Sequence, residues 1–84
     1  MSKLKIDGRM DFVILRECAK NLHYTITGDS YRELIMENKF VTMRFFLKKR
    51  STVVFYKSKV YGFSESNALN QLYMNYIEEY VKKK

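Results

Sequence analysis

The stretch that decides the fold is residues 40–59, FVTMRFFLKKRSTVVFYKSK. Its first half alternates, with apolar side chains on one side at Val41, Met43, Phe45 and Leu47. Alternation with a period of two is typical of a strand that covers a core with one face. Residues 52–57 are rich in β-branched and aromatic side chains, which favour a second strand. Residues 49–51 supply the turn, so the stretch predicts a β-hairpin.

The length of the hairpin loop decides which side chains share a face, because a shift of one residue turns a strand over. A three-residue loop sets Phe55 beside Phe45. It also gathers a second group on the opposite face, namely Arg44, Phe46, Lys48, Val54 and Tyr56. A loop of two or four residues pairs Phe45 with Val54 instead. We prefer the three-residue loop, because it buries Val53 and Phe55.

A helix follows the hairpin. Ser64 is a suitable N-cap, and Glu65 places a negative charge in the first turn, where the helix dipole favours it. Apolar side chains then recur at helical spacing and form one face: Leu69, Leu72, Tyr73, Tyr76, Ile77 and Tyr80. The sequence therefore predicts an amphipathic C-terminal helix that packs on the sheet.

The N-terminal half predicts a helix over residues 11–22, with Asp11 as its cap and a short strand before it at Lys3–Ile6. Residues 23–27 are typical of a strand. Residues 31–38 are ambiguous, because Ser30 and Glu33 fit a capping box while the alternation after them fits a strand, which we favour. With no linker or repeat in the chain, we expect one domain over residues 1–84. Its class is α+β, a small antiparallel sheet of three or four strands with an N-terminal and a C-terminal helix in α-β-β-β-α order.

The charge is concentrated in one segment. The chain carries a formal net charge of +7, from 16 Lys or Arg and 9 Asp or Glu. Residues 41–63 contain no acid and hold six cations, Arg44, Lys48, Lys49, Arg50, Lys57 and Lys59. Such asymmetry bears on partners and association rates more than on the fold, and it favours an anionic partner.

Composition excludes several classes of protein. There is no long apolar segment that would cross a membrane and no apolar run typical of a signal peptide, so we expect a cytoplasmic protein, in the host cytoplasm if it is viral. The single cysteine, Cys18, cannot form an internal disulfide. One Cys and one His do not make a conventional zinc site, and we expect no metal and no cofactor.

Signatures of enzymes are absent as well. The chain has no P-loop, GxGxxG, GxSxG or HExxH pattern. Cys18 falls on the apolar stripe of the first helix and is expected to fill core space rather than to react. His23 has no nearby nucleophilic or orienting partner in the sequence, so a small ribonuclease that uses His23 is our third hypothesis only. We expect a protein that is not an enzyme.

The hairpin combines cations with aromatic rings, the two side-chain types that bind phosphates and stacked bases. Our first hypothesis is a non-catalytic module that binds DNA or RNA, mainly through the phosphate backbone. Its predicted contact residues are Arg44, Phe46, Lys48, Lys49, Arg50, Tyr56, Lys57 and Lys59. The alternative is a small phage-type inhibitor or adaptor that binds a host protein or nucleoprotein enzyme through the same face, with aromatic and Arg side chains as anchors.

Overall fold

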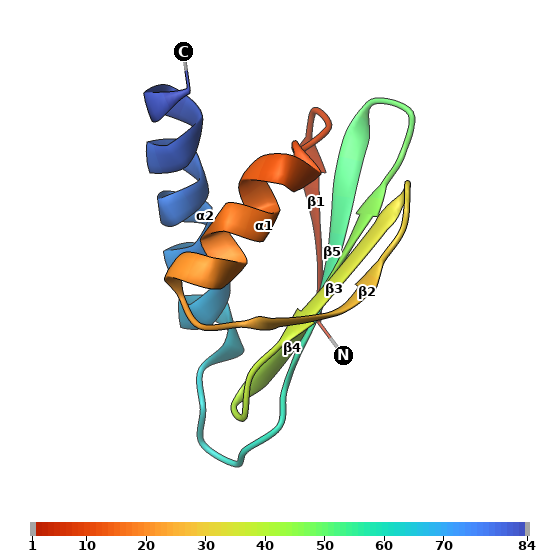
Figure 1. The fold of residues 1–84 in the computed structure, drawn as a ribbon. Coiled ribbons are helices and arrows are strands. Elements are labelled where there is room, and N and C mark those ends of the chain that lie inside the picture. The colour runs from red at the N-terminus through yellow and green to blue at the C-terminus, as the bar shows by residue number, and fades with distance from the viewer. Residues whose placement is uncertain (1, 84) are drawn as a thin grey trace.

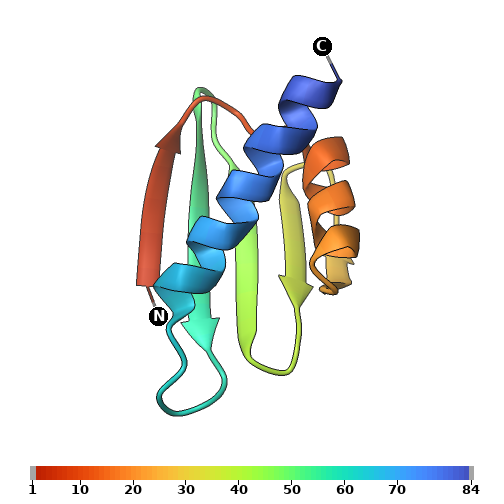
Figure 2. The same cartoon turned by 90° about the vertical axis from the view of Figure 1, so that its left-hand side faces the viewer.

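The computed structural model describes residues 2–83 as one antiparallel sheet covered by two helices. The elements are β1 (Ser2–Asp7), α1 (Phe12–Asn21), β2 (Thr25–Asp29), β3 (Glu33–Glu37), β4 (Val41–Leu47), β5 (Ser51–Ser58) and α2 (Glu65–Lys82). The strands lie in the order β1-β5-β4-β3-β2. Both helices cover the same face of the sheet (Figure 1), and α2 crosses it obliquely while α1 lies beside it (Figure 2). We call the other side, which no described helix covers, the open face.

The α+β class is confirmed, but the sheet has five strands, where the sequence led us to expect three or four. The difference comes from β1, which precedes the first helix and pairs with β5 from one end to the other. Residues 31–38 do contain the favoured strand, β3. Residues 59–63 turn toward α2 and add no strand.

The hairpin register that we preferred is wrong. The Lys48 amide donates to the Ser51 carbonyl at 2.8 Å, which closes a two-residue loop, and Phe45 lies opposite Val54. This register places Phe45 and Val54, both fully buried, under the helices. Val53 lies on the open face and is still only 6% exposed. Burial of Val53 does not require the three-residue loop, because β1 pairs alongside β5 and shelters Val53 without turning it toward the helices.

Both helices begin at the predicted caps. The Val13 amide donates to the Asp11 carboxylate at 2.8 Å, and the Asn67 amide donates to the Ser64 hydroxyl at 3.3 Å. The end of α1 is a Schellman motif, because the Tyr24 amide reaches back to the Ala19 carbonyl at 2.7 Å.

The core fills the space between the sheet and the helices. Its fully buried side chains include Leu15 and Cys18 from α1, Leu34, Met36, Met43 and Phe45 from the sheet, and Leu72 from α2. The Tyr76 hydroxyl of α2 accepts a hydrogen bond from the Asp11 amide at 2.8 Å and so joins the two helices. The apolar face predicted for α2 is only partly covered, since Tyr73 remains 40% exposed. Within residues 2–83, neither helix combines the length and apolar character needed to cross a bilayer.

Candidate nucleic-acid interface

The open face carries both apolar and charged side chains. The strand registers bring together Lys3, Lys5 and Asp7 of β1, Val53, Phe55 and Lys57 of β5, Thr42, Arg44 and Phe46 of β4, and Glu33, Ile35 and Glu37 of β3. Phe46 and Phe55 lie on neighbouring strands in diagonal positions, because Phe46 is opposite Val53 and Phe55 is opposite Arg44. The two rings are therefore neighbours on one surface.

These rings and the cations around them form a shallow depression of about 290 Å³, which we call the aromatic hollow. Its lining residues are Lys3, Arg44, Phe46, Lys48, Val53 and Phe55. The Lys3 ammonium lies over the Phe55 ring, 5.9 Å from its centre, and the Lys48 ammonium lies over the Phe46 ring at 5.0 Å. Such cation–π contacts hold an ammonium group beside an aromatic ring, so that one ligand can contact the ring and the charge together. The hollow thus offers π surface and positive charge within the same few ångströms.

A second depression, of about 430 Å³, adjoins the first, and we call it the basic hollow. It is lined by Arg9, Arg32, Leu47, Lys48 and Lys49, and none of these described lining residues is acidic. Two backbone hydrogen bonds hold its loops together. The Leu47 amide donates to the Arg32 carbonyl at 2.8 Å, and the Gly8 amide donates to the Arg50 carbonyl at 2.9 Å. Lys48 lines both hollows, so the aromatic and the basic surfaces are continuous.

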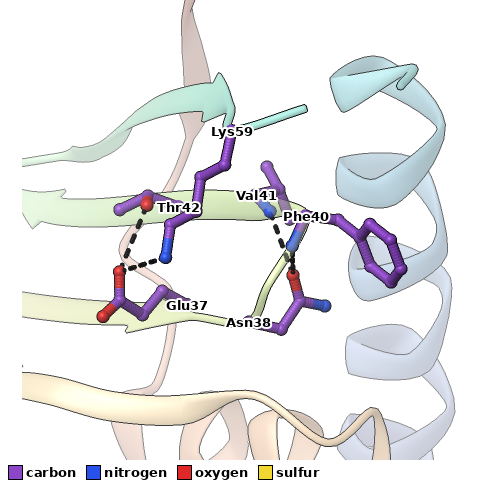
Figure 3. A network of polar contacts seen from close by, with 6 residues as sticks. All are labelled: Glu37, Asn38, Phe40, Val41, Thr42 and Lys59. Carbon is purple, nitrogen blue, oxygen red and sulfur yellow. Dashed lines mark hydrogen bonds and ion pairs between the residues drawn. The ribbon is translucent and has the colours of Figure 1, made fainter. Parts of the chain in front are cut away.

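Two of the predicted cations are neutralised by acids of β3. Arg44 forms an ion pair with Glu33. The Lys59 ammonium lies 2.7 Å from the Glu37 carboxylate, which also accepts a bond from the Thr42 hydroxyl at 3.4 Å (Figure 3). The hydrogen bond and the charge of Lys59 together lower the pKa of the Glu37 carboxyl below its ordinary value.

The other predicted cations remain available. Lys48, Lys49, Arg50 and Lys57 are exposed and make no ion pair with any residue in the 2–83 range. Lys48 and Lys49 line the basic hollow, and Lys57 lies on the open face. These side chains, rather than Arg44 and Lys59, are the ones that an external anion meets without breaking an ion pair.

One predicted contact residue lies on the wrong face. Tyr56 is opposite Met43 and packs against the core beneath the helices, because the two-residue loop turns it away from Phe46. Phe55 takes the place that we expected for Tyr56.

Three further cations line the hollows but were not among the contact residues predicted from the sequence, namely Lys3, Arg9 and Arg32. Lys3, like Lys5 beside it on the open face, belongs to the predicted Lys3–Ile6 strand, whose alternation is a usable signal once β1 is paired with β5. Arg9 and Arg32 come from separate loops. No local pattern marks them, since only the folded chain brings these loops to the β4–β5 turn.

His23 has a structural role at the end of α1. Its backbone adopts a φ of 63°, the left-handed conformation that the Schellman motif requires, and its amide donates to the Lys20 carbonyl at 3.3 Å. His23 lines a cleft of about 520 Å³ whose described lining includes no acid. Cys18 is buried in the core, and burial raises the pKa of its thiol to about 11.

Comparison with known proteins adds no assignment. No family model matches the chain, and no curated protein and no solved structure matches it either. Within residues 2–83, no group of three or more His, Cys, Asp or Glu side chains is placed to hold a metal ion.

Proposed function

We propose that the protein is a small, non-catalytic module that binds single-stranded nucleic acid on its open face. The observation that carries this proposal is the continuity of the aromatic hollow with the basic hollow through Lys48. Proteins that bind single strands combine a positively charged track for the backbone with rings on which bases stack. The two parts meet at the β4–β5 hairpin, where Lys48 lines both.

The two hollows have different tasks in this proposal. Phe46 and Phe55 stack with bases, which favours a single strand because the bases of a duplex are already stacked on one another. Arg9, Arg32 and Lys49 receive phosphates in the basic hollow, where no acid of the lining opposes them. Lys48, at the boundary, contacts either the phosphate or the base next to it.

The test is a titration of fluorescent DNA and RNA oligonucleotides at several salt concentrations. Each phosphate contact on a single strand contributes a slope of about −0.7 to the plot of log affinity against log salt. The variant Arg9→Gln/Arg32→Gln/Lys49→Gln removes three contacts and is expected to flatten that slope by about 2. The matched control, Lys20→Gln/Lys82→Gln/Lys83→Gln, loses the same charge from α1 and from the C-terminal end of α2, and should leave the slope unchanged.

Two results would contradict the proposal. The first is the absence of binding tighter than about 10⁻⁴ M at low salt, which is weaker than ordinary nonspecific association. The second is an equal change of slope in both triple variants, which would assign the affinity to net charge alone. A protein-binding role, our alternative, predicts the first result together with capture of a protein partner that depends on Phe46 or Phe55 and only modestly on salt.

A further inference from the structure

Strand β1 forms an exposed edge of the sheet. The strand order places β1 and β2 at the two edges of the described sheet, and in Figure 2 neither helix reaches past β1. The β2 edge is short and is interrupted by a bulge between Ile26 and Gly28, which hinders pairing with another strand. By contrast, β1 keeps an unbroken register with β5 from Ser2 to Asp7. Of the two edges, β1 is the one that suits a further strand.

The backbone groups that this edge offers follow from the register. The Gly8 amide donates to the Arg50 carbonyl, so Gly8 and Arg50 are a hydrogen-bonded pair of the antiparallel ladder. Hydrogen-bonded and non-hydrogen-bonded pairs alternate along two antiparallel strands. Counting back from Gly8 in steps of two, Ser2, Leu4 and Ile6 are therefore the residues of β1 whose backbone groups point toward β5. The amides and carbonyls of Lys3, Lys5 and Asp7 therefore point outward, away from the sheet.

We propose that this edge pairs with the same edge of a second copy of the chain, antiparallel, with Lys5 opposite Lys5 of the second copy. In this register Lys3 lies opposite Asp7 of the second copy, and the two-fold axis repeats the contact on the other side. Each of these pairs consists of outward-facing residues and can exchange both of its backbone hydrogen bonds. Opposite charges directly across a ladder stabilise it, so the edge is complementary to itself.

The apolar side of β1 supports the same arrangement. Leu4 is 43% exposed and, with Ile6 and Tyr73, lines a hollow of about 250 Å³ between β1 and α2. In the proposed register, Leu4 lies opposite Ile6 of the second copy on this side of the sheet. Pairing would therefore cover exposed apolar surface of both copies. It would also leave the two open faces side by side.

The charges of β1 count against the neighbouring register that sets Lys3 opposite Lys5. If Lys3 faced Lys5 of the second copy, four lysines would oppose one another and no acid would offset them, which destabilises a ladder. The proposed register keeps one opposed lysine pair, at Lys5. An extended acidic segment of another protein is the competing occupant of the edge, and the experiment below separates it from a second copy.

The experiment is sedimentation equilibrium of the full chain over a range of concentrations, without nucleic acid, so that its outcome does not depend on the proposed function. The wild type is expected to form dimers as its concentration rises. Lys3→Asp and Asp7→Lys each place like charges opposite one another and should weaken the dimer by about tenfold or more. The double variant Lys3→Asp/Asp7→Lys restores opposite charges and should restore the dimer. Lys5→Thr removes the opposed lysines and should strengthen it.

Folding is not at risk in these variants, because Lys3, Lys5 and Asp7 are exposed; thermal unfolding serves as the check. Hydrogen exchange gives a second reading, since the amides of these three residues should become protected as the dimer forms. A chain that stays monomeric at every concentration would overturn the proposal, even if it bound an acidic peptide. So would a dimer that the single variants do not weaken, or one that the double variant fails to restore.

Discussion

Raising the pH from 8 to 10 is expected to weaken the fold through one buried thiol, that of Cys18. This side chain has no exposed surface, and the pKa of its thiol is raised from 9.0 to about 11. The main cause is burial, which takes the thiolate out of water, and the nearby carboxylates of Glu79 and Glu17 raise the pKa further. Between pH 9 and pH 11 the unfolded chain gives up this proton while the folded chain keeps it, so stability falls as the pH rises.

The size of the effect follows from the two pKa values. A thiol that ionises at 9.0 in the unfolded chain and at about 11 in the folded chain lowers the free energy of unfolding by about 1.3 kcal/mol between pH 8 and pH 10. The part of the stability that depends on the protonated Cys18 thiol is fully present at pH 8 and is lost progressively up to about pH 11. A loss of this size is measurable in a domain whose total stability is roughly 5–15 kcal/mol.

Urea titrations of the wild type and of Cys18→Ala at pH 8 and pH 10 isolate this contribution. Burial also raises the pKa values of Tyr24 and Tyr76, but both tyrosines are present in both chains, so most of their effect cancels in the comparison; the charge of Cys18 is only the smallest cause of the Tyr76 shift. At pH 8 the variant is expected to be less stable by about 1–3 kcal/mol, because it loses a small buried side chain. At pH 10 that difference should shrink by about 1.3 kcal/mol. A difference that stays the same at both pH values would refute the assignment of the alkaline loss to Cys18.

Three further predictions concern the site and the fold. Phe46→Ala and Phe55→Ala should each weaken binding by about 1–3 kcal/mol, because one base loses the ring on which it stacks. The salt slope of the oligonucleotide titration should stay unchanged. A smaller slope would mean that the rings act by positioning the cations and not by stacking with bases. A chain that ends at Gly62 lacks α2 and should show no cooperative thermal transition, because its sheet would lose one of the two helices that cover the core, and a sharp transition would contradict this. Hydrogen bonds from the Ser2 hydroxyl and the Ser58 amide lower the pKa of the Glu65 carboxyl. The ionised carboxylate therefore stabilises the fold above its ordinary pKa of 4.5, and this contribution is lost as the pH falls through the lowered pKa. Glu65→Gln should therefore flatten the acid side of the stability curve, and identical acid unfolding of both chains would count against it.

The sequence predicted those features of the fold that short segments determine. The Asp11 and Ser64 caps each depend on a side chain and an amide two or three residues later, so local sequence is sufficient to find them. The face of β4 that enters the core was also predicted, because its alternation repeats over the whole strand. The order of the elements was predicted as well, including a short strand before the first helix. The pairing of that strand with β5, which makes it the fifth strand of the sheet, was not predicted, because it joins segments that are far apart in the chain.

The candidate site was predicted only in part, and the reason is the hairpin loop. Its length differs by one residue between the two registers, and that difference exchanges Tyr56 for Phe55 on the open face. Nothing in residues 48–51 excludes either loop, so only the pairing of Phe45 with Val54 in the folded core decides between them. Arg9 and Arg32 could not be foreseen, since contacts between distant loops bring them to the hairpin turn.

The distribution of charge over the open face indicates how a bound strand would lie. The acids of this face are at its margins, with Glu33 and Glu37 on β3 and Asp7 at the end of β1. Between them, β4 and β5 present Phe46, Phe55 and cations without an acid, and this strip leads directly into the basic hollow at the turn. A polyanion that ran across the strands would meet the acids of β3, whereas one that runs along the hairpin avoids them. We therefore expect the backbone of a bound strand to follow the direction of β4 and β5, with its phosphates entering the basic hollow at the β4–β5 turn.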